Sequence, residues 1–431
     1  MPHIESDLMT RAAMSRFGFL PLALLTLAST GSTVIMAAAE DWGQWRGPTR
    51  DGWARAADAP ADWPEKLTKK WTAPAGEGYS SPVVSGSLVF VHSRRDPEEV
   101  VTAYDLATGA IRWTDHYTAS FTKNQYAVNM AKGPNSTPVA ADGRVFTLGV
   151  TAVLTSYDAA TGRVRWRKDF SKEIDTGKLF CGTAMSPVLD RNLLFVHIGD
   201  DRRGAVLAFD AATGDERWRL DADGPGYASP VIADIAGRRQ LITLTDKSII
   251  GVAVDRGALL WRVPFPDEWN ENIITPIVSG NRVIVAGVRK GTIALDVTNG
   301  GGEWKATEAW RNPDITMYMS SPILDNGKLY GLSSKRKGQF FCLDAATGRA
   351  LWTTEGREGQ SASLIAAGAH LLHLTTDGDL IITRRDAPTF TPLRRYELSE
   401  SATWPHPALI GSQLLIRDAS NLTLWTTGPS R

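Results

Sequence analysis

One short phrase recurs along the chain and ends each time on a tryptophan. It is YDLATGAIRW from Tyr104, YDAATGRVRW from Tyr157, FDAATGDERW from Phe209 and LDAATGRALW from Leu343, with a shorter copy, VDRGALLW, from Val254. In such a phrase the Asp accepts hydrogen bonds from the N–H groups just ahead of it, and the Gly supplies the positive φ that ends a short hairpin loop with a bulge. A turn that recurs in this way constrains the chain to a repeated hairpin architecture.

Each repeat contains four short apolar segments separated by turns, and this pattern predicts four antiparallel strands per unit. Six units begin at a proline that follows Ser or Thr, a seventh begins without proline at 361–368, and an eighth begins at 406–411. Many four-stranded units at regular spacing are typical of a β-propeller. The six prolines are Pro82, Pro138, Pro187, Pro230, Pro276 and Pro322.

The eighth unit has three of its strands, the last at 422–427, and the segment LTKKWTA (67–73) carries a tryptophan in the register of the missing fourth. A strand supplied from the other end of the repeats removes both sheet edges. We therefore predict an all-β, eight-bladed β-propeller of four-stranded antiparallel blades over 66–431, closed by an N-terminal strand, with seven blades as the alternative.

The first 39 residues predict an export signal. Arg11 and Arg16 precede an apolar run (17–29), and the small residues of 35–41 offer a cleavage site. Between the signal and the propeller lies an N-terminal arm, 40–65, which contains four tryptophans and is interpreted either as a strap on the propeller or as a partner-binding extension. We expect a monomer located in the periplasm or outside the cell.

The repeat tryptophans are expected to pack each blade against the next, because no blade can bury its own faces. The set predicted to have this structural role is Trp71, Trp113, Trp166, Trp218, Trp261, Trp310 and Trp352.

Strand parity places the between-blade connections and the second-to-third-strand turns on one face, where the longer segments 116–136 and 170–185 also fall. Aromatic and amide residues just before the repeat prolines are predicted to surround the mouth of the central channel there. They either plug the channel or form a ring that binds a planar ligand or an extended peptide. These mouth residues are Tyr79, Asn135, Tyr227, Asn272, Tyr318 and Trp404.

Lysine and arginine total 47, as do aspartate and glutamate, and this balance argues against a nucleic-acid-coating protein. Basic clusters nevertheless occur in four of the second-to-third-strand turns. They are interpreted either as solvated turn tips or as a basic rim that attracts an anionic ligand or an acidic partner, with binding that weakens in high salt. The rim comprises Arg94, Arg95, Arg202, Arg203, Arg289, Lys290, Lys335, Arg336 and Lys337.

The phrase D-A-x-T-G-x-x-x-W resembles the tryptophan-docking repeat of the pyrroloquinoline-quinone-type (PQQ-like) eight-bladed propellers, and it recurs in phase through nearly all of 66–431. The segment DWGQWRGPTRDG (41–52) resembles the opening of exported PQQ-like repeat proteins. This superfamily contains quinoprotein alcohol dehydrogenases and the non-catalytic propeller of the outer-membrane β-barrel assembly machinery.

The chain departs from the dehydrogenase pattern. It has two cysteines, Cys181 and Cys342, so it lacks the adjacent-cysteine ring and the C-x-x-C-H haem motif. No catalytic residue or metal ligand is therefore predicted. The expected function is an exported scaffold that binds a protein or extended peptide, without cofactor and at most peripheral to a membrane. The alternatives are a dehydrogenase that uses PQQ with Ca²⁺ and a polysaccharide-binding module.

Overall fold

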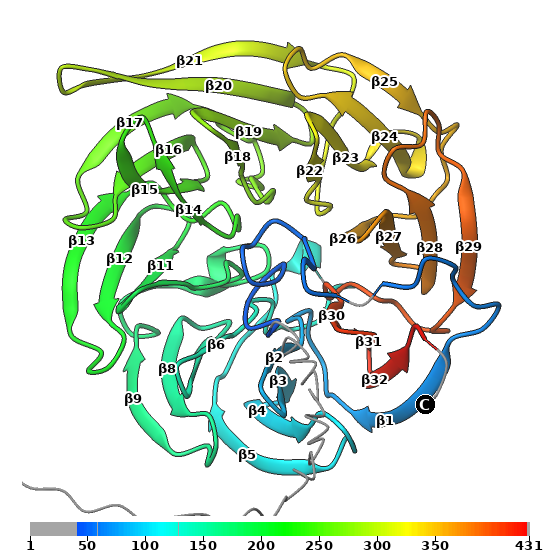
Figure 1. The fold of residues 1–431 in the computed structure, drawn as a ribbon. Helices are drawn as coiled ribbons and strands as arrows, with labels where there is room; N and C mark the ends of the chain where they lie inside the picture. The colour runs from blue at the N-terminus through cyan, green and yellow to red at the C-terminus, as the bar shows by residue number, and fades with distance from the viewer. Residues whose placement is uncertain (1–40, 58, 128, 429–431) are drawn as a thin grey trace, which may run out of the picture. The chain divides into compact units, whose positions relative to one another are not determined.

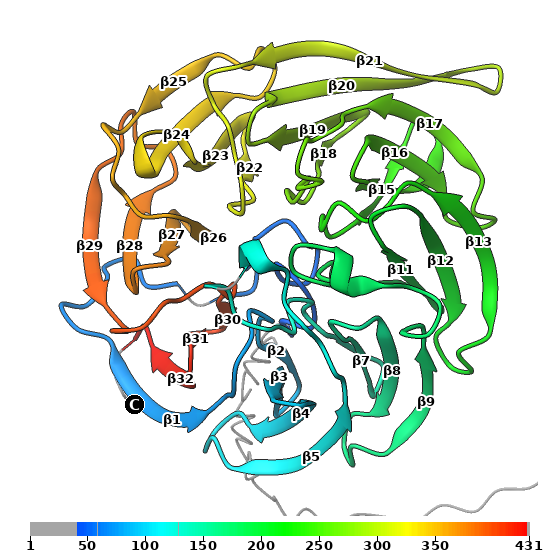
Figure 2. The same ribbon diagram turned by 180° about the vertical axis from the view of Figure 1, so that it is seen from behind.

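The computed structural model describes residues 41–57, 59–127 and 129–428, so the predicted export signal lies outside the described residues. Strand pairing groups the described chain into eight four-stranded antiparallel sheets. They are arranged around a central axis, as Figures 1 and 2 show from the two sides. The prediction of an eight-bladed all-β propeller is confirmed, and the seven-bladed alternative is wrong.

We number the blades I to VIII in chain order. The strands of the first four are, for blade I, β2 (Val83–Ser85), β3 (Leu88–Arg95), β4 (Glu98–Asp105) and β5 (Ile111–Thr118); for blade II, β6 (Val139–Ala141), β7 (Arg144–Leu148), β8 (Val153–Asp158) and β9 (Val164–Asp169); for blade III, β10 (Val188–Asp190), β11 (Leu193–Gly199), β12 (Gly204–Asp210) and β13 (Glu216–Ala222); for blade IV, β14 (Val231–Ile235), β15 (Arg238–Leu244), β16 (Ser248–Ala253) and β17 (Leu259–Pro264).

The strands of the other four are, for blade V, β18 (Ile277–Ser279), β19 (Arg282–Gly287), β20 (Gly291–Gly300) and β21 (Glu303–Asn312); for blade VI, β22 (Ile323–Asp325), β23 (Lys328–Ser333), β24 (Gln339–Asp344) and β25 (Ala350–Thr353); for blade VII, β26 (Ala362–Ala367), β27 (His370–Thr375), β28 (Asp379–Arg384) and β29 (Pro392–Glu397); for blade VIII, β30 (Ala408–Ile410), β31 (Gln413–Arg417), β32 (Asn421–Thr426) and β1 (Thr68–Pro74). Three short 3₁₀ turns occur among the described residues: η1 (Gln125–Ala127), η2 (Thr176–Lys178) and η3 (Lys335–Lys337).

The ring is closed by the N-terminal strand, as predicted. Strand β1 pairs antiparallel with β32, in a register that runs from Thr68 opposite Thr426 to Pro74 opposite Asn421. Blade VIII therefore combines three strands from the end of the repeats with one from their beginning, and β32 has a hydrogen-bonded neighbour on both sides.

The repeated turn joins the third and fourth strands and also receives the tryptophan of the preceding blade. In blade II, the Asp158 carboxylate accepts hydrogen bonds from the backbone N–H and the hydroxyl of Thr161, at 3.1 and 2.9 Å. Gly162 follows with a φ of +75°, and a Cβ there would lie 2.6 Å from the Trp113 indole of blade I. The glycine is therefore required both by the backbone and by the tryptophan that covers it.

The same indole also donates a hydrogen bond across the blade boundary. Its Nε1 lies 2.9 Å from the Ala159 carbonyl, one residue after the turn aspartate. Four other blade boundaries have the equivalent bond, at 2.9–3.2 Å: Trp71 to Leu106, Trp166 to Ala211, Trp218 to Val254 and Trp310 to Ala345.

Trp261 is a correction to the predicted set, because its indole points into its own blade. Its Nε1 donates to the Gln240 side chain at 2.7 Å, and its ring lies over Gly251. The reason is in blade V, where the long β20–β21 hairpin replaces the D-x-x-T-G turn that would have received the indole. That hairpin extends past blade IV (Figure 1), and Trp304 near its tip packs against the blade IV core. Trp352 faces blade VII, which also lacks the turn, and packs against Tyr330 and Phe390 instead.

The hydrophobic core lies in layers between neighbouring blades. One cluster, for example, joins Phe146 and Leu154 of blade II to Leu194 and Leu207 of blade III, all fully buried. Neither blade could bury these side chains alone, so the stability of the ring depends on neighbour contacts.

The N-terminal arm packs on the propeller from inside its channel, a position that the interpretation as a strap did not specify. Trp42 forms a β-bridge with Val84 of blade I and stacks on His406 before blade VIII, with ring centroids 6.0 Å apart. The arm then turns inside the ring and returns through Ala54, whose N–H donates to Ala366 O of blade VII. In Figure 1 it is the dark blue loop at the centre of the ring.

Two arginines anchor the inserted arm. Arg46 donates to Pro322 O of blade VI at 2.5 Å, and Arg50 donates to Pro187 O of blade III at 2.9 Å. Both are almost fully buried, and burial lowers their pKa values to about 10 and about 9. Their bonds are to backbone carbonyls, so each guanidinium links the arm to a first strand of the ring.

Among the described residues, no helix has the length and apolar character needed to cross a membrane.

Candidate functional site

A cavity opens at one end of the channel, on the face that carries the between-blade connections, which we call the loop face. Figure 2 is viewed from this face, with the segments that carry η1 and η2 in front of the ring. The cavity encloses about 980 Å³, including the space open to solvent at its mouth. The inserted arm closes it from below, where Trp45 donates to the Thr275 hydroxyl at 2.8 Å.

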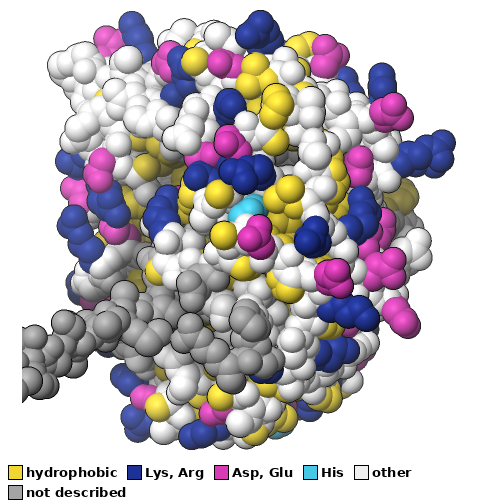
Figure 3. Space-filling view, turned by 45° about the vertical axis from the view of Figure 1, so that its right-hand side comes forward, with side chains coloured by type: hydrophobic (Ala, Val, Ile, Leu, Met, Phe, Trp, Pro, Cys, Tyr) yellow, Lys and Arg dark blue, Asp and Glu magenta, His cyan; other side chains and the backbone are white. Residues whose placement is uncertain are grey.

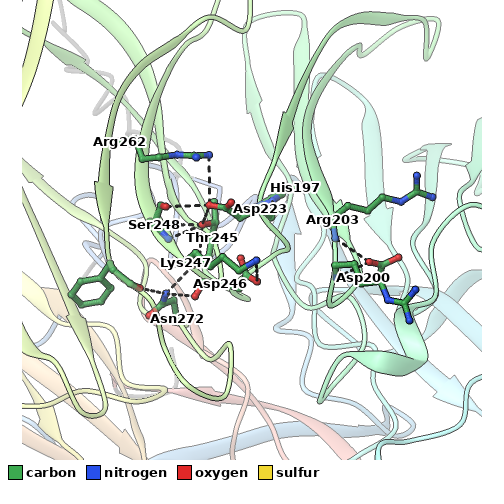
Figure 4. Close-up of polar contacts among 12 residues, drawn as sticks. His197, Asp200, Arg203, Asp223, Thr245, Asp246, Lys247, Ser248, Arg262 and Asn272 are labelled. Carbon is green, nitrogen blue, oxygen red and sulfur yellow. Dashed lines mark hydrogen bonds and ion pairs between the residues drawn. The ribbon is translucent and has the colours of Figure 1, made fainter.

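Five of the six residues predicted at the mouth line this cavity: Tyr79, Asn135, Tyr227, Tyr318 and Trp404. The sixth, Asn272, is fully buried and does not line it, so its predicted place in the mouth is wrong. Its amide donates to the carbonyls of Thr245 and Phe265, at 2.9 and 2.8 Å. Figure 4 shows Asn272 directed into this polar cluster between the strands of blade IV and the connection to blade V.

The tyrosines of the lining are fixed by the loops that cover the mouth. The Tyr79 hydroxyl accepts a hydrogen bond from Ala131 N at 3.0 Å, and the Tyr227 hydroxyl accepts one from Phe180 N at 2.8 Å. Tyr227 has a φ of +73°, a backbone conformation that is unfavourable for a bulky residue and that persists only where the surroundings hold it. Both rings are therefore held in place before any ligand arrives.

Glu271 is the one charged side chain among the described residues that line the cavity. Burial raises its pKa, although a hydrogen bond from the Tyr318 hydroxyl and the charge of Arg289 favour the carboxylate. Burial also raises the pKa of Tyr318, as does the adjacent carboxylate, so the phenol stays protonated and remains the donor.

Sequence reasoning missed several members of the lining. Glu271 is the residue directly before Asn272, which the sequence had predicted at the mouth. Choosing the position one residue earlier in this connection would have identified Glu271. Trp45 comes from the arm, which has no repeat register, and Phe180 and Cys181 come from the irregular 170–185 segment. Burial raises the pKa of Cys181 to about 12, so its thiol is protonated and a weak nucleophile at neutral pH.

A shallower groove adjoins the cavity and shares Phe180, Tyr227 and Glu271 with it. Tyr126 and Trp269 border the groove, and they are the most exposed large hydrophobic residues that the structure describes, at 75% and 59%. The mouth therefore continues outward as an aromatic surface on the loop face.

The predicted basic rim is only partly exposed. Arg94 is buried, donates to Ala119 O at 2.7 Å and forms an ion pair with Asp96, so its assignment to the rim is wrong. Arg289 is paired with Glu268 at 3.1 Å and lies over the ring of Trp269. The others are exposed or half-buried, and none of the nine lines the cavity: Arg95, Arg202, Arg203, Lys290, Lys335, Arg336 and Lys337.

Acidic and basic side chains are mixed elsewhere on the surface. On the side drawn in Figure 3, Lys and Arg are interspersed with Asp and Glu. Near blade IV, Asp223 lies 3.5 Å from Arg262 and accepts hydrogen bonds from the hydroxyls of Thr245 and Ser248 (Figure 4). Within residues 41–57, 59–127 and 129–428, no group of three or more His, Cys, Asp or Glu side chains is placed to hold a metal ion.

Known proteins resemble this chain in both sequence and fold. "Outer membrane protein assembly factor BamB" from Shewanella oneidensis is 26% identical over 237 residues, which span 50% of this chain and 56% of the relative. "Quinohemoprotein alcohol dehydrogenase ADH-IIG" from Pseudomonas putida is 30% identical over 98 residues, 22% of this chain and 13% of that enzyme. The solved structure of a europium-containing methanol dehydrogenase superposes with a TM-score of 0.64 at 14% identity, covering 90% of this chain and 98% of that chain, and so supports the fold alone.

The profile of one protein family matches residues 58–115 and 98–354, which together are more than half of the chain. The matched region runs from the arm through β1 and blades I to VI, and includes all the repeats with a D-x-x-T-G turn. The chain therefore belongs to the family described as outer membrane protein assembly factor BamB.

Proposed function

We propose that this protein is an exported, non-catalytic propeller that binds a protein segment at the mouth of its channel and supports the assembly of outer-membrane proteins. The observation that carries the proposal is the lining of the mouth, which is aromatic and holds one charged group among its described residues. Membership of the family named for outer-membrane protein assembly supports the cellular role.

The residues at the mouth do not fit PQQ with Ca²⁺. PQQ is a tricarboxylic acid, and the described lining contains no Lys, Arg or His to neutralise it, while Glu271 would repel it. Ca²⁺ takes six to eight oxygen ligands, usually with several carboxylates. No second Asp or Glu accompanies Glu271 in the described lining. These mismatches support a binding role over an oxidoreductase role.

The cellular role is tested by deleting the gene in the source organism. We expect lower amounts of folded outer-membrane β-barrel proteins, measured by their heat-dependent mobility on gels, and recovery on expression of the intact protein. Unchanged amounts would refute the role in assembly.

The non-catalytic assignment is tested with purified protein mixed with PQQ and Ca²⁺. We expect neither saturable binding in the absorbance spectrum nor dye-linked alcohol oxidation. Binding with turnover would instead establish the dehydrogenase alternative.

A further inference from the structure

The rings at the mouth are arranged as an aromatic cage, which we define as Trp45, Tyr79, Tyr227, Tyr318 and Trp404. They come from the arm and from the loops before blades I, IV, VI and VIII, and all five line one cavity. Tyr79 and Trp404 lie against each other, with centroids 5.5 Å apart and planes inclined by 41°. Aromatic rings attract a cation that lies over their faces, within about 6 Å of the ring centroid.

The charges at the mouth favour a cation as well. Glu271 lies in the cavity lining, and the adjoining groove adds Asp201 and Glu268 against a single described base, Lys178. Arg289, whose charge acts on Glu271, is paired with Glu268, and Lys123 donates to Met130 O.

Three neutral side chains of the lining, those of Asn135, Tyr79 and Tyr227, accept a hydrogen bond or have a free acceptor atom. The Oδ1 atom of Asn135 is buried without a hydrogen-bond partner, while its amide nitrogen donates to Cys181 O at 3.1 Å. The hydroxyls of Tyr79 and Tyr227 already accept backbone N–H groups. A ligand that brings N–H donors would satisfy the unpaired amide oxygen, whereas an anion would not.

We propose that the aromatic cage binds the ammonium or guanidinium group of a Lys or Arg side chain on an extended segment of a partner protein. This inference rests on the proposed function, which supplies a protein as the partner. The cation would lie among the five rings, with Glu271 as its counter-ion. The flanking backbone would follow the adjoining groove between Tyr126 and Trp269, whose exposed rings give it a surface on which to pack. An acidic segment, which the basic turn tips had suggested, does not match this lining.

The test compares three short peptides that differ at one central residue: acetyl-Gly-Lys-Gly-amide, the same peptide with norleucine, and the same peptide with glutamate. Binding to the intact protein is followed by calorimetry and by tryptophan fluorescence, because Trp45 and Trp404 belong to the cage. We expect the lysine peptide to bind about 10-fold or more tightly than the norleucine peptide, since 1.4 kcal/mol from cation–π and charge pairing is tenfold in affinity. We expect no binding of the glutamate peptide.

Two matched variants assign the effect to the cage. Glu271→Gln keeps the shape of the side chain and should lower the preference for lysine over norleucine, because the counter-ion is lost while the rings remain. Glu303→Gln changes an exposed acid at the tip of the β20–β21 hairpin, outside both the cavity and the groove, and should leave the preference within about twofold. Equal melting curves for the two variants and the parent protein would exclude unfolding as the cause.

Several outcomes would overturn the inference: no binding of the lysine peptide at millimolar concentration, equal binding of the norleucine peptide, or a lysine preference that Glu271→Gln leaves unchanged. Tighter binding of a neutral oligosaccharide such as maltohexaose would also overturn it, in favour of a saccharide site. The peptide titration and the gene deletion can fail independently. If the protein binds the lysine peptide but the gene deletion does not change the amounts of β-barrel proteins, the cellular role is refuted and the inference about the cage stands.

Discussion

The contact between each tryptophan and the glycine of the next blade can be tested with one methyl group. At Gly214, where φ is +77°, an added Cβ would lie 2.8 Å from Cδ2 and 3.0 Å from Cγ of Trp166. Carbon atoms in contact prefer about 3.5–4.0 Å, so the indole would have to move by roughly 1 Å. Its hydrogen bond to Ala211 O, already 3.2 Å long, would be weakened or lost.

The expected cost of Gly214→Ala has three parts. An alanine at positive φ costs about 1–2 kcal/mol, overpacking against the indole about 1–3 kcal/mol, and the weakened hydrogen bond about 1 kcal/mol. We therefore expect the free energy of unfolding to fall by about 3–6 kcal/mol in total. The chain offers a matched control in Gly237, whose φ is +79° and whose added Cβ would meet no atom within 4 Å. Gly237→Ala should cost the backbone part alone, about 1–2 kcal/mol.

The measurement is urea denaturation followed by far-ultraviolet circular dichroism, with midpoints compared at equal slope. A double-mutant cycle adds a second check. Trp166→Ala alone should cost about 3–5 kcal/mol, but in that background Gly214→Ala should cost no more than Gly237→Ala, because nothing remains to clash with the new methyl group. Equal midpoints for the two single glycine variants, or additive costs in the double variant, would refute the idea that this contact holds the blades together.

Three further predictions follow from the arm, the closing strand and a buried histidine. Deleting residues 41–74 should lower the urea midpoint and produce concentration-dependent association on size exclusion, because it leaves β32 with an open edge; a deletion variant that melts and elutes like the parent would contradict ring closure. Arg50→Ala should lower the free energy of unfolding by about 3 kcal/mol, because the buried carbonyls of Ser186 and Pro187 lose their donor. A change in the urea midpoint smaller than its error would show that Arg50 does not anchor the arm. Burial lowers the pKa of His373 from its ordinary 6.5 to about 3. The unfolded chain therefore binds this proton at a higher pH than the folded chain, and the free energy of unfolding falls as pH drops from about 6.5 toward 3. At pH 5 this loss is about 2 kcal/mol. The melting temperature of His373→Gln should therefore fall less between pH 7 and pH 5 than that of the parent protein. An equal fall in the two proteins would contradict the prediction.

The fold could be predicted from sequence because its repeat is encoded locally. The Asp, Thr and Gly of each turn satisfy one another within a few residues, so their spacing locates the third and fourth strands without knowledge of the rest of the chain. The closing strand could be found in the same way, since Trp71 keeps the register of the repeat. Trp261 could not be assigned correctly, because the orientation of its indole depends on the turn of the following blade, which has been replaced by a long hairpin.

The site was predictable only where it follows the repeat. Residues three or four positions before a repeat proline lie at the mouth, and five of the six named there line the cavity. Asn272 was misplaced because the connection before blade V turns its side chain inward, toward the carbonyls of Thr245 and Phe265, and leaves Glu271 at the surface of the cavity. The arm has no repeat at all, so nothing in its sequence indicated that Trp45 would close the cavity from below.

The insertion of the arm also determines when the ring can be completed during synthesis. Residues 41–74 are synthesised before all the repeats, yet their partners include His406 and β32, which are synthesised after blade VII. An incomplete chain can form the blades whose four strands are consecutive in sequence. Strand β1, however, stays unpaired until β32 of blade VIII is available. Blade VIII can therefore be completed only after the other seven blades have been synthesised, because β1 needs β32 as its partner. Without blade VIII, β1 has no strand to pair with, and an unpaired strand can pair with other chains.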